Sequence, residues 1–202
     1  HRDLHSFSTR RSSDLSLTVP TIDLSQSVYT YDNTAKQPSV TVKDGTVVIP
    51  SVEYTVEYSN NINAGTATIT ISDNPDGNYY VSGTTTFTIN KVTPTVTAPT
   101  AKSLTYNGNA QALLNAGSTN WGTLKYSSDG TNYSTTIPSA TNANTYGVYY
   151  KVEGNNNVND VAPVGISVTI AKANGSVSTA PVNTNYTYNG TARAVASAGS
   201  GS

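Results

Sequence analysis

The chain lacks cysteine and methionine entirely, contains one tryptophan and two histidines, and is charged at only 11% of its 202 residues. Without cysteine it has no disulfide framework, no thiol nucleophile and no thiolate metal site. Both histidines, His1 and His5, lie at the N-terminus. Acid–base chemistry elsewhere would therefore depend on carboxylates, lysines or tyrosines.

Basic clusters and long apolar runs are also missing. The formal net charge is −1, and lysine and arginine are scattered after the first fifteen residues. Nucleic acids and anionic membranes attract basic patches, so neither is a predicted partner. No apolar run approaches the roughly 20 residues that a membrane-spanning helix needs, and we predict no membrane contact by this segment.

A tyrosine-centred phrase occurs three times in the sequence. It reads Tyr29-Thr-Tyr-Asp-Asn-Thr-Ala-Lys36, Leu104-Thr-Tyr-Asn-Gly-Asn-Ala-Gln111 and Tyr186-Thr-Tyr-Asn-Gly-Thr-Ala-Arg193. The period of about 80 residues is longer than a solenoid unit of 20 to 50 residues and suits small domains with their own cores. We predict repeats at 16–91 and 92–172 and the truncated start of a third at 173–202.

Short strands are predicted wherever apolar and polar residues alternate. In residues 64–71, Ala67, Ile69 and Ile71 share one face and threonines occupy the other. The same alternation predicts further strands in residues 54–58, 85–89, 146–152 and 166–170. Turn sequences such as Asn107-Gly108 separate these segments. The pattern indicates an all-β protein of antiparallel β-sandwiches.

The junctions between the predicted repeats are short. Ile89-Asn-Lys-Val-Thr-Pro94 and Ile170-Ala-Lys-Ala-Asn-Gly175 lead from the last strand of one repeat almost directly into the next. Such connections restrict the angles that two domains can sample. They predict beads on a string with a semi-extended arrangement.

The repeated phrase, together with Glu53-Tyr-Thr-Val-Glu-Tyr-Ser59 and the closing Phe87-Thr-Ile-Asn-Lys91, resembles the tandem immunoglobulin-like repeats of large bacterial surface proteins, including the YDG and MBG types. The resemblance extends from Leu17 onward and implies tandem immunoglobulin-like β-sandwich domains. It also implies a bacterial, extracellular or cell-surface location. Asn33 stands where the other copies have Gly108 and Gly190, and asparagine tolerates the left-handed backbone that this turn needs.

Residues 1–15 have a different origin in our interpretation. They resemble one translated reading frame of a short-read sequencing adapter, with Ser8 as the single departure. A basic targeting peptide is the alternative, but no apolar core follows it. We therefore expect a non-native, disordered leader.

Two aromatic residues are candidate glycan contacts. Trp121, with Tyr126 and Tyr133 nearby in sequence, suits a sugar-stacking platform, although the only tryptophan of a small β domain often fills its core. Tyr149 is the second candidate, because alternation places its ring on the outer face of a strand. Scattered exposed aromatics are common, so an inert surface residue is its alternative.

Other site chemistries are not predicted. Asp73-Asn-Pro-Asp-Gly-Asn78 is rich in oxygen atoms but lacks the late glutamate of a calcium loop and contains Pro75, so we expect a hairpin turn. An isopeptide crosslink needs a buried lysine, and alternation places no lysine inward. No carboxylate pair recurs between repeats. We expect no catalytic residue, no metal and no cofactor.

These features predict a non-catalytic stalk or spacer in a large bacterial adhesin-like protein. Its expected partners are adjacent repeats of the parent chain and host or microbial glycans or proteins. A carbohydrate- or mucin-binding module that uses Trp121 and Tyr149 is the alternative.

Overall fold

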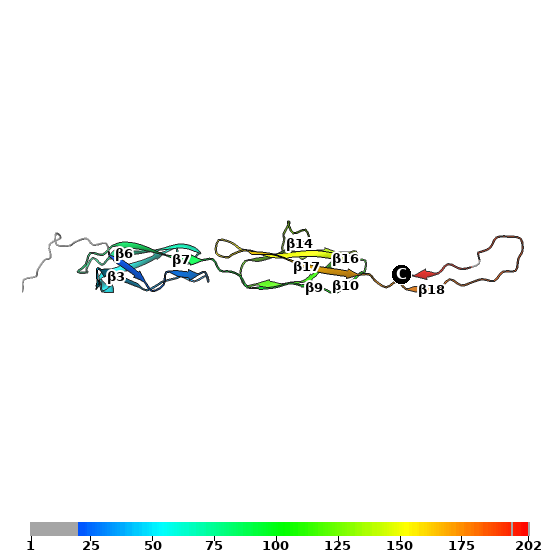
Figure 1. Ribbon diagram of the computed structural model, residues 1–202, viewed down its shortest axis with the longest axis horizontal. Helices are drawn as coiled ribbons and strands as arrows, with labels where there is room; N and C mark the ends of the chain where they lie inside the picture. Colours follow the sequence, from blue (N-terminus) through cyan, green and yellow to red (C-terminus); the bar gives the residue numbers. More distant parts are fainter. Residues whose placement is uncertain (1–19, 195, 202) are drawn as a thin grey trace, which may run out of the picture. The chain divides into compact units, whose positions relative to one another are not determined.

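The computed structural model describes residues 20–194 and 196–201 (Figure 1). Residues 1–15, the predicted leader, lie outside the described residues. In the described part the protein is all-β, as predicted, with one short 3₁₀ helix, η1 (Ser51–Glu53), and no α-helix. None of its helical structure has the length or apolarity to cross a membrane.

The chain forms two compact units. The first contains the described residues up to Thr95, together with Asn120–Gly122 and Glu153–Val161. The second contains Val96–Thr119, Thr123–Val152 and the described residues from Ala162 onward. Two short segments from the second sequence repeat are therefore built into the first unit.

The first unit consists of two sheets. The larger has the order β2 (Val28–Thr30), β7 (Gly83–Asn90), β6 (Gly65–Asp73), β5 (Tyr54–Ser59), and the smaller has the order β1 (Thr21–Leu24), β3 (Val40–Asp44), β4 (Val47–Val48). Strand β2 runs parallel to β7, and the other neighbours are antiparallel. Figure 1 shows β6 and β7 in one layer and β3 in the other.

Alternation correctly predicted which side chains of these strands face the core. Ala67, Ile69 and Ile71 of β6 are fully or almost fully buried, and Phe87 and Ile89 of β7 are buried beside them. The intervening Thr86 and Thr88 are exposed. The predicted turn at 73–78 is likewise present, because residues 74–82 connect the antiparallel strands β6 and β7.

The second unit has one larger sheet and several two-stranded pairs. The sheet order is β10 (Leu104–Thr105), β17 (Val161–Ala171), β16 (Asn144–Glu153), β14 (Thr123–Ser127). The pairs are β8 (Val96–Thr97) with β13 (Ser118–Thr119), β9 (Thr100–Ala101) with β12 (Leu114–Asn115), and β11 (Gln111–Ala112) with β15 (Ser139–Ala140). Its core includes Leu113, Leu114, Val148, Val168 and Ile170.

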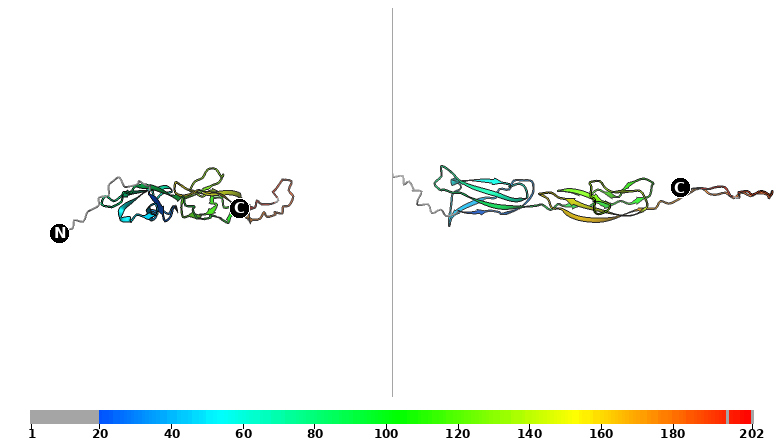
Figure 2. Two further views of the ribbon diagram at one scale, coloured as in Figure 1. Left: turned by 60° about the vertical axis from the view of Figure 1, so that its left-hand side comes forward. Right: turned by 90° about the horizontal axis from the view of Figure 1, so that it is seen from above.

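The third copy of the repeated phrase lies in a long loop closed by β18 (Val177–Thr179) and β19 (Ser200–Gly201) (Figure 2). The pair Thr179 with Ser200 corresponds in sequence to Thr97 with Ser118 of β8 and β13, and the register shifts at the next pair, Val177 with Gly201. Among the described residues of this segment, Val177, Val182, Tyr186 and Tyr188 are exposed. None of its described residues belongs to either hydrophobic core.

The turn after the central tyrosine has the same backbone in all three copies. Gly108 and Gly190 have φ angles of 80° and 81°, and Asn33 has a φ of 65°. This is the left-handed region that glycine adopts freely and asparagine tolerates. The substitution of asparagine for glycine in the first copy therefore preserves the turn, as predicted.

Candidate functional site

Tyr149 projects from the outer face of β16, as alternation predicted, and its side chain is 38% exposed. Glycine backbone borders its ring. A Cβ atom built on Gly165 would lie 3.3 Å from Tyr149 Cε1, and one on Gly130 would lie 3.5 Å from Cε2. The ring thus rests against the sheet and the loop after β14.

The loop after β14 is held by one carboxylate. Asp129 Oδ1 accepts hydrogen bonds from the Ser127 hydroxyl and from the backbone N–H groups of Thr131 and Asn132, at 2.7 to 2.8 Å. The Asn132 side-chain amide donates to its Oδ2. These donors, the Asn132 amide first, hold the pKa of Asp129 far below its usual range. Asp129 is an ionised structural acceptor at neutral pH.

Trp121 lies in the first unit. It is partly buried against that unit's core, and its ring meets the Tyr31 ring edge-on with centroids 5.5 Å apart. Tyr126 instead belongs to the core of the second unit, where its hydroxyl accepts a hydrogen bond from the Gly117 N–H. Trp121 thus packs against a core, which is the alternative expected for the only tryptophan of a small β domain.

Tyr133 has a separate contact in the second unit. The Lys151 ammonium lies 4.7 Å from the centroid of its ring, within the range of a cation–π interaction. The pair involves the loop after β14 and the outer face of β16, the strand that also carries Tyr149. This contact joins the loop to the sheet, and the Lys151 ammonium lies over the face of the Tyr133 ring.

Lys36 is a buried lysine that the alternation of the strands did not identify. It is only 8% exposed, and its ammonium donates to Asp32 Oδ1 and to the Thr34 hydroxyl. Alternation missed its burial because it lies in the loop between β2 and β3, where no strand periodicity applies. The hydrogen bond from Lys36, followed by those from Thr34, lowers the pKa of Asp32 to about 2.

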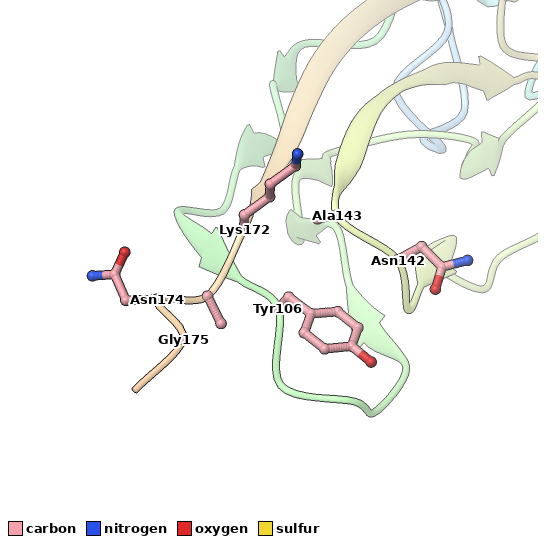
Figure 3. Close-up of a pocket in the computed structure, with 7 residues that line it drawn as sticks. Tyr106, Asn142, Ala143, Lys172, Asn174 and Gly175 are labelled. Atoms are coloured by element: carbon pink, nitrogen blue, oxygen red, sulfur yellow. The ribbon is translucent and has the colours of Figure 1, made fainter. Parts of the chain in front are cut away.

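A cavity of about 460 Å³ opens in the second unit beside Tyr106. Tyr106 lies between the segment containing Lys172 and Gly175 and the segment containing Asn142 and Ala143 (Figure 3). The Tyr106 side chain is 43% exposed, although its counterpart Tyr31 in the first unit is only 8% exposed. Sequence reasoning missed this cavity, although the triple occurrence of the tyrosine phrase was a signal that could have located it.

Among the described residues, no group of three or more histidine, cysteine or acidic side chains is placed to hold a metal ion. Comparison of the sequence with protein-family models and with curated proteins gives no match. Three features are candidates for function: the ring of Tyr149, the cavity beside Tyr106, and the parallel strand pair in each unit, β2 with β7 and β10 with β17.

Proposed function

We propose that the chain is a non-catalytic stalk segment of tandem immunoglobulin-like repeats, which transmits tension in a large extracellular bacterial protein. The observation that carries this proposal is the parallel pairing of an early strand with the last strand of each repeat. In the first, Val28–Thr30 pair with Thr88–Asn90; in the second, Leu104–Thr105 pair with Ile170–Ala171.

Parallel pairing determines how tension acts on the hydrogen bonds. When the two ends of a repeat are pulled apart, β2 and β7 are drawn in opposite directions along their own axes. Their hydrogen bonds, which run across the strands, are then sheared together. An antiparallel hairpin pulled at its open end instead breaks its bonds one after another. The pairing therefore supports a mechanical role.

Hydrogen bonds beyond the paired residues extend this contact in the first unit. The Thr88 N–H donates to the Ser27 carbonyl at 2.9 Å, and the Tyr31 N–H donates to the Asn90 carbonyl at the same distance. In the second unit the Tyr106 N–H donates to the Ala171 carbonyl at 2.8 Å. The first unit has the longer parallel ladder and is expected to resist the greater force.

Single-molecule force spectroscopy tests this role. Because the chain has no cysteine, two introduced cysteines define the pulling points. Val28→Cys with Asn90→Cys pulls β2 and β7 in shear. Thr55→Cys with Ser72→Cys, an exposed antiparallel pair of β5 and β6, opens a hairpin as the control. The shear pair should require several times the force of the control, and equal forces would contradict the proposal.

A second candidate function is glycan binding through Tyr149, favoured by the exposure of its ring on the outer face of β16. A glycan array with the unaltered chain and Tyr149→Ala separates the two functions. Saturable binding that disappears in the variant would assign a binding role to this face. Tyr149 is a cleaner target than Trp121, whose ring packs against a core.

A further inference from the structure

The residues that line the Tyr106 cavity have counterparts in the first repeat. Tyr106 corresponds to Tyr31 in the repeated phrase. The motif Asn142-Ala143 before β16 corresponds to Asn63-Ala64 before β6, and Lys172, just after the last strand, corresponds to Lys91. The same side of the repeat can therefore be compared in two copies.

In the first unit this side of the repeat is covered. The ring of Trp121 packs edge-on against Tyr31. The Ala64 N–H donates to Asn157 Oδ1 at 2.8 Å, and the Asn157 side-chain amide donates to Asn63 Oδ1 at 2.9 Å. All of these contacts lie within the first unit, which Asn120–Gly122 and Glu153–Val161 complete.

The segment after β7 makes further contacts with residues 155–159, the loop that carries Asn157. Val92 exchanges hydrogen bonds with the 155–159 loop: its N–H donates to the Asn157 carbonyl at 3.0 Å, and its carbonyl accepts from the Asn159 N–H at 2.9 Å. The Lys91 ammonium donates to the Asn155 carbonyl at 2.9 Å. One aromatic ring, one asparagine side chain and one backbone segment thus fill this side of the first repeat.

In the second unit the corresponding side is open. Tyr106 is 43% exposed, and Asn142, Lys172 and Ala173 are exposed around the cavity (Figure 3). By sequence position, the Ala143 N–H corresponds to the Ala64 N–H and the backbone of Ala173 to that of Val92. The cavity therefore presents an aromatic ring and a set of backbone and side-chain groups that match those covered in the first unit.

We propose that the cavity beside Tyr106 is the docking site for two loops of a following copy of the repeat, those equivalent to Asn120–Gly122 and Glu153–Val161. The tryptophan of the incoming copy packs on Tyr106. Its counterpart of Asn157 bridges the Ala143 N–H and the Asn142 side chain, and its loop carbonyl accepts from Lys172. The proposal deepens the stalk function and rests on it, because each repeat is then completed by its successor.

The described residues 177–194 and 196–201 share features with the beginning of such a copy. Thr179 pairs with Ser200 as Thr97 pairs with Ser118. A Cβ atom on Gly199 would meet Pro181 Cδ at 2.8 Å, just as one on Gly117 would meet Pro99 Cδ at 2.8 Å. Because Ser200 corresponds to Ser118, appending a copy of residues 119–172 after Ser200 continues the repeat in register.

The test is hydrogen exchange of this extended chain beside the original. The amides of Ala143 and Ala173 are expected to exchange at least about tenfold more slowly in the extended chain. In the appended copy, alanine at the duplicate of Trp121 or of Asn157 should remove this protection. Alanine at the duplicate of Asn156, which is exposed in the original chain, should leave the protection unchanged. An appended copy whose own strands are protected while Ala143 and Ala173 exchange as before would overturn the proposal.

A second measurement keeps the proposal testable if the appended copy does not fold. In the original chain, Trp121→Ala and Asn157→Ala should each accelerate exchange of the Ala64 amide, and Asn156→Ala should not. If both leave that amide unchanged, the two loops do not cover the first repeat and the docking proposal fails. The stalk function is tested separately by the force difference between shear and hairpin pulling, so the failure of one is distinguishable from that of the other.

Discussion

The ring of Trp121 meets the ring of Tyr31 edge-on, with centroids 5.5 Å apart and planes inclined at 64°. This geometry directs the electropositive edge of one ring at the electron-rich face of the other, which favours aromatic pairs beyond their buried area. Tyr31 belongs to the first copy of the repeated phrase, and Trp121 is a residue of the second sequence repeat. The first unit thus includes a ring contact between residues far apart in the sequence.

Replacing Trp121 with alanine should therefore destabilise the first unit. The variant loses the contact with Tyr31 and part of the apolar cover of the core, and we expect a loss of about 2 kcal/mol in free energy of unfolding. Denaturant titration with hydrogen exchange of β2 and β7 measures it. Tyr188→Ala is the control, because that side chain is 92% exposed. Equal stability of the two variants would show that the ring pair contributes nothing.

Asn157 should contribute separately through its side-chain amide. Asn157→Ala leaves the Ala64 N–H without its acceptor and removes the donor to Asn63 Oδ1. We expect a loss of about 1 to 2 kcal/mol from the first unit, since each hydrogen bond contributes about 1 kcal/mol net. Thermal denaturation gives the comparison. The adjacent Asn156→Ala, at an exposed position, should unfold as the original chain does.

The strands were more predictable from the sequence than these contacts. Period-two alternation identified the buried faces of β6, β7, β16 and β17, because side chains of a strand point alternately to its two sides. Alternation says nothing about loops, so the burial of Lys36 and the contact of Trp121 with Tyr31 were not foreseen. Trp121 and Asn157 lie in segments without periodicity, and their contacts are between positions distant in sequence. Comparison of equivalent positions shows that Trp121 contacts Tyr31, the counterpart of Tyr106. It also shows that Asn157 contacts the counterparts of Asn142 and Ala143.

Acid should weaken the loop that contains Asp32. Lys36 and Thr34 lower the folded-state pKa of Asp32 to about 2, while an unfolded aspartate has a pKa of about 3.9. The ionised form is therefore favoured by folding. Its contribution is complete above about pH 4 and is lost as the pH falls toward 2.

The measurement is chemical denaturation of the original chain and of Asp32→Asn between pH 7 and pH 2. The original chain should be the more stable at pH 7, and the difference should shrink steadily below pH 4. Asp76→Asn serves as the control, because Asp76 is exposed and its hydrogen bond to Asn74 is donated by the backbone. A difference between the original chain and Asp32→Asn that is constant across this range would contradict the assigned role of the Lys36 contact.

The glycines beneath Tyr149 allow its ring to lie against the sheet. A Cβ atom at Gly165 would come within 3.3 Å of the ring, whereas one at Gly147 would remain 3.8 Å away in ordinary contact. Gly165→Ala should therefore displace the ring outward, and Gly147→Ala should leave it in place. Because alanine restricts the unfolded chain more than glycine does, Gly147→Ala should stabilise the second unit by about 0.5 kcal/mol.

Nitration of Tyr149, followed by peptide mass spectrometry, distinguishes the two variants. We expect the ring to react several times faster in Gly165→Ala than in the original chain, and at an unchanged rate in Gly147→Ala. Its partial exposure gives the ring space to move, so Gly165→Ala should alter reactivity more than stability. Equal reactivity in the two variants would mean that Gly165 does not set the position of Tyr149. The contact between Gly130 and the other edge of the ring would then be the one that fixes it.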